Sequence, residues 1–398
     1  MKDAQKVLTI AVASRVLVIA VMVVSSLLFT YATTEHMNVK EMNTPFVGMF
    51  IRFDSVYYMK IAQNGYPLGY PKTIPASTGT GSPMPPRVAN ALYSFFPFYP
   101  AVMRALATAF TPILNLTTSL LVAGVIISNV AFLFSAYFFY KLTRKLFNSQ
   151  VALISTVFYS FWIGGVFFSA IYTEALFMAL ALGAFYHLEE NKLPIAVILG
   201  FLASFTRSDG FLIFIPFLVY GLLQFRPSKI QSIKLILSSA IVASPYLLFN
   251  IAGYFSAGGV FPVQIIARES NWGIYPLLIN QFVAPYCVVP SFQAFEIIVL
   301  ILVLTPTAYF TFNIKKTLTL ETKTLGYWAF YVSMVHVLFT DSGISSSARY
   351  AIPMLPIYWV LAKIYTKKRL VGAVLFAVIT TMLVIAAYML ETANPNLL

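Results

Sequence analysis

The feature that most constrains this chain is a series of long apolar runs, the first of which extends from Leu8 to Tyr31. A helix of about 20 apolar residues crosses the hydrocarbon core of a bilayer and satisfies its own backbone hydrogen bonds there. The sequence is 59% hydrophobic and 10% charged, whereas soluble domains carry about 25% charged residues. We therefore expect an all-α polytopic membrane protein in which residues 1–398 form a single integral membrane domain. The first run is too long for a cleavable signal peptide, so we expect it to be a membrane span.

The apolar runs predict about eleven transmembrane helices. Several runs are shorter than the length of a full span, so tight hairpins and re-entrant pieces are expected among them. Residues 92–112 are also apolar, but Pro97, Pro100 and Arg104 favour an interfacial helix over a span. The predicted helices cover residues 8–31, 117–140, 151–169, 172–188, 193–206, 211–225, 233–256, 296–314, 325–340, 349–366 and 370–390.

Charged residues are distributed unevenly between the predicted loops. With the N-terminus inside, most of the 26 lysine and arginine residues fall in short inner loops, which satisfies the positive-inside rule. Topology therefore explains the net charge of +13, and we exclude nucleic-acid binding. Most acidic residues fall on the outer side, where the long loops 32–115 and 257–295 are predicted. This asymmetry indicates an extracytoplasmic active site, with a plain solvated rim as the alternative.

The stretch from Phe50 to Tyr66 is predicted to form a short interfacial helix that Gly65 ends. It places one acid, Asp54, in the first helical turn. A carboxylate there stabilises the helix terminus, which is the structural interpretation. In the functional interpretation, a carboxylate at the lipid–water boundary is a general base for a substrate presented from the membrane.

Further outward-facing motifs contain candidate site residues. The motif YTEALF places Glu174 at a helix start, where a carboxylate also favours the helix dipole. In TRSDG, Arg207 and Asp209 either form an ion pair that satisfies a tight turn or provide a phosphate-binding arginine. Further candidates lie in the C-terminal half of the chain, namely Arg268 and Trp272 in the second long loop, and His336, Asp341 and Arg349 near the C-terminal end.

These motifs resemble the PIG-V-type mannosyltransferases, which are the GPI mannosyltransferase 2 family and its prokaryotic relatives. The resemblance rests on the order of Phe53-Asp54, FFPFYP at 95–100, YTEALF and TRSDG, and it covers most of residues 45–215. The family typically has Trp-Asp in place of Phe53-Asp54, which keeps an aromatic residue beside the acid. It often has Arg-Ser-Asn-Gly where this chain has Asp209, so the family role of that asparagine does not transfer directly.

The resemblance implies a GT-C-type glycosyltransferase that uses a polyprenyl-phosphate sugar and carries its catalytic acid in the first outer loop. We therefore predict an inverting mannosyltransferase with Asp54 as general base. Arginines stabilise a lipid-phosphate leaving group without a metal, and we expect no metal and no cofactor. The predicted donor phosphate ligands are Arg207, Arg349, Lys60 and Arg268, and the predicted acceptor or positioning residues are Glu174, Asp209, Tyr57, Asp341 and Trp272.

The expected partners are a polyprenyl- or dolichyl-phosphate mannose donor, a glycolipid or glycan acceptor, and the bilayer. A prokaryotic plasma membrane fits the chain best, and the ER membrane is the location if the source is eukaryotic. The rival function is a transporter or lipid flippase with Arg15 and His336 on a polar pathway, because a charge within a span is a functional hypothesis by default. Against it, Arg15 is expected to snorkel to the inner surface, His336 lies near the outer end of its span, and no inverted repeat is evident.

Overall fold

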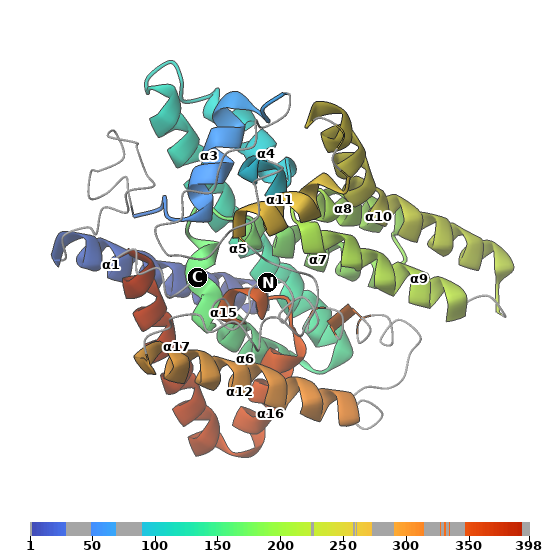
Figure 1. Ribbon diagram of the computed structural model, residues 1–398. Helices are drawn as coiled ribbons and strands as arrows, with labels where there is room; N and C mark the ends of the chain where they lie inside the picture. Colours follow the sequence, from blue (N-terminus) through green and yellow to red (C-terminus); the bar gives the residue numbers. More distant parts are fainter. Residues whose placement is uncertain are drawn as a thin grey trace.

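The computed structural model describes residues 2–28, 49–68, 90–223, 227–257, 259, 261–272, 290–313, 327, 330–331, 334 and 347–391 (Figure 1). Within these residues every regular element is a helix, and none is a strand. The all-α fold expected from the apolar runs is therefore confirmed for the described part of the chain.

Four helices of the described residues are long and apolar enough to cross a membrane. They are α1 (Lys2–Leu28), α5 (Leu116–Leu146), α10 (Lys229–Ser256) and α17 (Arg369–Glu391). Three of them contain the predicted spans 117–140, 233–256 and 370–390, and α1 contains residues 8–28 of the predicted span 8–31, whose last three residues lie outside the described part of the chain. The chain is thus an integral membrane protein, while the count of eleven spans stays a prediction.

Several predicted spans are broken into shorter pieces. Residues 151–169 form α6 (Ser149–Ser160) and the 3₁₀ helix η3 (Ile163–Phe168), and residues 211–225 form the 3₁₀ helix η4 (Ser208–Ile213) and α9 (Phe214–Leu223). Residues 349–366 form α15 (Ser347–Tyr350) and α16 (Pro356–Lys367) around Pro353. The continuous helices predicted at 151–169 and 349–366 are wrong, because apolar composition does not report where an α-helix gives way to a 3₁₀ helix or to a turn at a proline. The helix predicted at 211–225 runs without a break through the described residues 208–223, with 3₁₀ geometry in its first part.

The remaining predicted helices are found with shifted bounds. They are α7 (Glu174–Glu189), α8 (Leu193–Ser204) and α12 (Pro290–Phe312). The two segments predicted as long outer loops contain α3 (Asp54–Asn64), which Gly65 ends, the 3₁₀ helix η2 (Ala91–Ser94), α4 (Phe98–Ala107) and α11 (Val263–Trp272). Of the helix predicted at 325–340, only Tyr327, Phe330, Tyr331 and Met334 are described.

The long helix α5 lies at the centre of the packing. It contacts α7, α6, α4 and α1, while α10 packs against α8 and α9, and α16 and α17 pack against each other (Figure 1). The core between these helices is rich in aromatic side chains, with Trp162, Tyr159 and Phe132 fully buried. The short elements η3, η4 and α15 fill the space between the helices, and three of the charged site residues lie in or beside η4 and α15.

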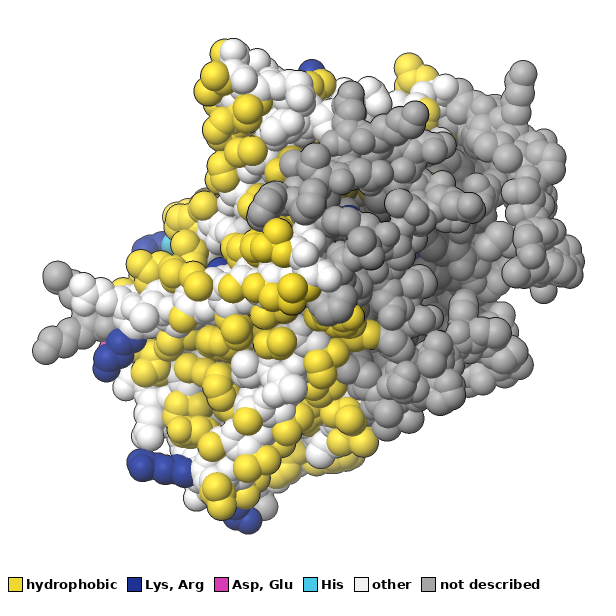
Figure 2. All heavy atoms as spheres, turned by 90° about the vertical axis from the view of Figure 1, so that its left-hand side faces the viewer, with side chains coloured by type: hydrophobic (Ala, Val, Ile, Leu, Met, Phe, Trp, Pro, Cys, Tyr) yellow, Lys and Arg dark blue, Asp and Glu magenta, His cyan; other side chains and the backbone are white. Residues whose placement is uncertain are grey.

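The outer surface of α1 and α17 is apolar. Leu8, Val12 and Val16 on α1 and Leu370 and Val374 on α17 are all exposed. Figure 2 shows hydrophobic side chains over much of the described surface on this side of the molecule, with lysine and arginine mainly at its edges. A surface of this kind is suited to contact with lipid chains, and it agrees with the membrane location.

Candidate active site

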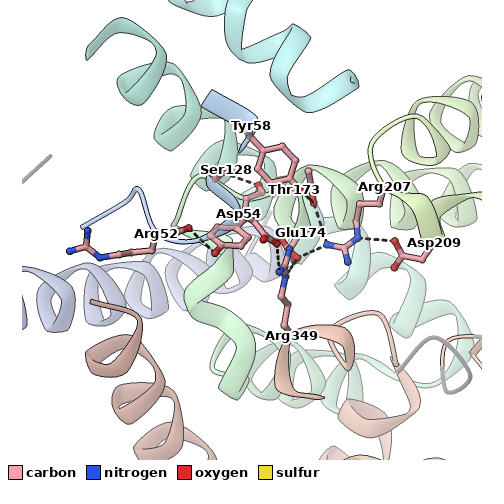
Figure 3. Close-up of polar contacts among 10 residues, drawn as sticks. Arg52, Asp54, Tyr58, Ser128, Thr173, Glu174, Arg207, Asp209 and Arg349 are labelled. Atoms are coloured by element: carbon pink, nitrogen blue, oxygen red, sulfur yellow. Dashed lines mark hydrogen bonds and ion pairs between the residues drawn. The ribbon is translucent and has the colours of Figure 1, made fainter. Parts of the chain in front are cut away.

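Asp54 is the first residue of α3, and the backbone immediately before it is strained. Phe53 has a φ of 50°, in the left-handed region that bulky residues rarely adopt and that typically costs about 1–3 kcal/mol. The hydroxyl of Tyr172 donates to the backbone carbonyl of Arg52 at 2.9 Å and so fixes this turn against the segment before α7. The side chain of Arg52 points away from the other site residues in Figure 3. Asp54 follows this strained turn, and its carboxylate pairs with Arg349.

Glu174 is the first residue of α7, and its side chain is only 3% exposed. Its Oε1 atom accepts hydrogen bonds from Arg207 Nη1 and from Arg349 Nε (Figure 3). Its other oxygen, Oε2, is buried and has no hydrogen-bond partner among the described residues. Glu174 is therefore the carboxylate that joins the two arginines.

Arg349 reaches this point from α15, far along the chain. Its Nη1 atom lies 2.6 Å from Oδ2 of Asp54. The guanidinium also lies over the ring of Tyr172, 4.7 Å from its centroid, and 5.3 Å from the centroid of Phe167. Aromatic faces hold a guanidinium in a fixed orientation by cation–π attraction, so Arg349 is positioned on its flat faces as well as on its polar edge.

Arg207 lies in the turn between α8 and η4. Its Nε donates to Asp209 Oδ1 at 2.9 Å, and its Nη1 also donates to Thr173 Oγ1 at 3.2 Å. The turn is close-packed, because a Cβ atom at Gly210 would lie 2.5 Å from the carbonyl oxygen of Ala203. The ion pair expected within this turn is present, and it is one part of a larger network.

The five side chains form one line of alternating charge, in the order Asp54, Arg349, Glu174, Arg207, Asp209. With every group ionised, three carboxylates face two guanidinium groups. The side chain of Asp54 is 25% exposed, whereas each of the other four is 10% exposed or less. Asp54 is therefore the member of the network that a substrate from outside would meet first.

The two arginines lie outside the long helices, and both remain charged. Burial alone would lower the pKa of each guanidinium, but the neighbouring carboxylates hold the pKa of Arg207 and of Arg349 well above the ordinary value. A buried charge of this kind is tolerated only when it is paired and hydrogen-bonded, as both are here.

Three further predicted site residues lie on α3 and α11. Tyr57 stacks on Phe95 with ring centroids 4.8 Å apart, and Lys60 is exposed on α3. Arg268 lies on α11, which packs mainly against η2 and α10. The structure thus brings five of the predicted residues together in one network of ion pairs.

The side chain of Trp272, and Asp341 and His336 altogether, lie outside the described residues. Within the described part of the chain, no group of three or more His, Cys, Asp or Glu side chains is placed to hold a metal ion. Whether activity needs a metal stays a prediction.

Sequence reasoning missed several residues that shape the site. Thr173 bonds Arg207 and lies 3.4 Å from the hydroxyl of Tyr58, and Tyr172 and Phe167 enclose Arg349. The available signal was proximity, since Tyr172 and Thr173 directly precede Glu174 in the same motif.

Arg15 does not snorkel to the inner surface as expected. Its side chain is 5% exposed and donates to the carbonyl oxygens of Ser160 and Gly165. These contacts account for the charge within α1 without a transport pathway. The expectation was wrong because the chain leaves helical geometry after α6, and the backbone carbonyls freed there accept the guanidinium.

Comparison with known families supports the resemblance seen in the motifs. Residues 88–257 match the family described as Mannosyltransferase (PIG-V), which confirms that prediction. The matched segment contains Glu174, Arg207 and Asp209, but it begins after Asp54 and ends before Arg349. No curated protein matches the chain.

Solved structures show the same fold. The archaeal oligosaccharyltransferase AglB from Archaeoglobus fulgidus, in complex with an inhibitory peptide and a dolichol-phosphate, matches 98% of this chain with 12% identity and a TM-score of 0.52. The oligosaccharyltransferase from the same organism in complex with Zn and sulfate matches 96% of this chain with 13% identity and a TM-score of 0.51. This chain covers 56% and 53% of those two chains, so it spans just over half their length. The chain thus shares the fold of these oligosaccharyltransferases over almost its whole length.

The network makes a prediction about stability. Glu174→Gln keeps the size of the side chain but removes the charge that both arginines share. Removing one partner of a buried ion pair typically costs about 3–5 kcal/mol, and because Gln retains an acceptor we expect a loss of about 3 kcal/mol. Thermal and denaturant unfolding of the purified protein in one detergent measure this loss.

Glu190→Gln is the matched control, because Glu190 pairs with Lys145 at the surface. The Lys145 ammonium lowers the pKa of the Glu190 carboxyl, but solvent screens an exposed pair strongly. We expect no clear change for this variant. Equal losses in the two variants would contradict the central place of Glu174.

Proposed function

We propose that this chain is an inverting mannosyltransferase that transfers mannose from a polyprenyl- or dolichyl-phosphate donor to a glycolipid or glycan acceptor. The observation that carries the proposal is the pairing of Asp54, a partly exposed carboxylate, with Arg349 at 2.6 Å. This contact places a candidate base beside a candidate phosphate ligand. The PIG-V family match supports mannose as the sugar, and the dolichol-phosphate named with one structure of the same fold supports a lipid-phosphate donor.

The proposed reaction is a single displacement at the anomeric carbon of the donor. Asp54 takes the proton from the acceptor hydroxyl while that oxygen forms a bond to the anomeric carbon. The bond between that carbon and the phosphate oxygen breaks, and its electron pair leaves with the polyprenyl phosphate. Arg349 and Arg207 stabilise the charge that develops on the phosphate. Glu174 and Asp209 hold the arginines rather than the acceptor, because their carboxylates are buried against them.

The charges of the network indicate how a donor phosphate would bind to Arg349. Three carboxylates already face two guanidinium groups, so a donor phosphate adds a further negative charge. We infer that the phosphate competes with Asp54 for Nη1 of Arg349, because Asp54 is the most exposed of the three acids. Arg349 keeps its bond to Glu174 through Nε during this exchange. Once released from Arg349, the Asp54 carboxylate is free to receive the acceptor's proton.

The reaction is proposed to take place on the extracytoplasmic side, with the N-terminus inside. The positive-inside rule supports this orientation. The loop 32–115, which contains Asp54, and the loop 257–295 would then both face that side. We propose that Tyr57, Trp272 and Asp341 contact the acceptor there. Lys60 and Arg268 are proposed to attract the donor phosphate before it reaches Arg349.

The proposal predicts opposite effects of Asp54→Asn on transfer and on donor binding. Asparagine keeps the size of the side chain but accepts no proton, so transfer falls by about 10²–10⁴-fold. Affinity for farnesyl phosphate, a short polyprenyl phosphate, rises because no carboxylate competes for Arg349. Transfer is measured at saturating donor and affinity by calorimetry in the same detergent.

Arg349→Lys and Glu190→Gln complete this experiment. The lysine cannot contact Asp54 and Glu174 together, so both affinity and transfer fall. Glu190→Gln, at a surface pair, leaves both unchanged. If Asp54→Asn retained more than about a tenth of wild-type transfer, the base would lie elsewhere.

The proposed orientation is tested separately by cysteine labelling. The only cysteine, Cys287, is replaced by serine, and Gln63 on α3 or Gln150 on α6 is replaced by cysteine. Both positions are exposed in the structure. An impermeant maleimide added to intact cells should label position 63, and should label position 150 only after the membrane is opened. The reverse pattern would place Asp54 on the cytoplasmic side.

A further inference from the structure

Arg15 is a buried arginine that the proposed reaction does not use. It lies within α1, and its guanidinium donates to the carbonyl oxygens of Ser160 and Gly165 and to Ser169 Oγ. The bonds to Ser160 and Ser169 are 3.0 Å and 3.2 Å long. Both carbonyl acceptors lie where helical hydrogen bonding is interrupted, at the end of α6 and within η3. One side chain of α1 therefore fastens η3 in place.

Aromatic rings complete the surroundings of Arg15. The guanidinium carbon lies 4.3 Å from the ring centroid of Phe132 on α5 and 5.6 Å from that of Phe168 at the end of η3. A charge inside a membrane protein is costly unless its partners are fixed, and here α1, α5, α6 and η3 all contribute to its environment. The hydrogen bonds to the backbone and to Ser169 around η3 therefore stabilise the buried guanidinium.

The segment that Arg15 fastens also carries the backbone of α15. The Nε1 atom of Trp162, just before η3, donates to the carbonyl oxygen of Ala348 at 2.9 Å. A Cβ atom at Gly164 would lie only 2.3 Å from the same oxygen, so only glycine permits this approach. Ala348 directly precedes Arg349. Contacts of Trp162 and of Gly164 in η3 with the carbonyl of Ala348 thus fix the backbone next to Arg349.

We propose that Arg15 is a positioning residue for Arg349, acting through η3, Trp162 and Ala348. Arg15 holds the non-helical backbone of η3, η3 holds α15, and α15 presents Arg349 to Glu174 and Asp54. Arg15 itself contacts neither acid. The inference rests on the proposed function only in giving Arg349 the donor phosphate as its ligand, since the structural connection stands without it.

Two variants test this connection, one at Arg15 and one at Trp162. Arg15→Met keeps the length of the side chain but makes none of the three hydrogen bonds, and Trp162→Phe keeps an aromatic ring but loses the N–H that binds Ala348. Arg15→Lys keeps the charge yet cannot reach both carbonyls, so it provides a milder variant should Arg15→Met fail to fold. Asp3→Asn is the control on the same helix, because Asp3 joins α1 to Tyr140 and Arg144 rather than to η3.

Two measurements are made on the full-length protein in detergent. Hydrogen exchange follows the backbone amides of residues 347–355, which Arg15 does not touch. Calorimetry measures the affinity for farnesyl phosphate. We expect exchange in residues 347–355 to accelerate at least several-fold, and the dissociation constant to rise about tenfold, in Arg15→Met and to a smaller degree in Trp162→Phe. Because the two residues act on one connection, the double variant should be no worse than Arg15→Met alone. Asp3→Asn should change neither quantity.

The proposal is overturned if Arg15→Met, or Arg15→Lys in its place, accelerates exchange in α1 and η3 while residues 347–355 keep their wild-type protection. It is also overturned if the effects of Arg15→Met and Trp162→Phe multiply as independent changes. Failure of the wild-type protein to bind farnesyl phosphate would instead count against the proposed donor. In that case, faster exchange at residues 347–355 would still establish Arg15 as a positioning residue.

Discussion

The candidate site depends on a single carboxylate oxygen, Oε1 of Glu174, which accepts hydrogen bonds from two arginines. Each arginine in turn binds a second acid, Asp54 or Asp209. Without Glu174, two buried guanidinium groups of like charge would face each other without a shared counter-charge, at high cost in a poorly hydrated site. The network thus sets the spacing between the proposed base and the proposed phosphate ligands, and it joins residues from four separate parts of the chain.

The fold could be predicted from the sequence only where an element is long and apolar. The helices α5, α10 and α17 were predicted because each is a long apolar run. The 3₁₀ geometry of η3 and η4 and the interruption after α15 were not, because hydropathy does not report hydrogen-bond geometry. These elements surround the candidate site, since η4 directly follows Arg207, α15 contains Arg349, and η3 packs against α15.

The site was predictable as a set of residues but not as a set of contacts. Asp54, Glu174, Arg207, Asp209 and Arg349 were all identified from their types and from their places near predicted outer helix ends. Asp54 and Arg349 are 295 residues apart in the chain, and no local pattern states that they pair. Arg15 was misjudged for a related reason, since its partners are backbone carbonyls that become free only where a helix unexpectedly ends.

The most direct test of the account is a transfer assay with purified protein and labelled mannose on either a polyprenyl phosphate or a nucleotide. The account predicts that polyprenyl-phosphate mannose alone supports transfer to a membrane glycolipid extract, with release of polyprenyl phosphate. Transfer from the nucleotide sugar, or mannose release that persists unchanged in Arg349→Lys, would contradict it.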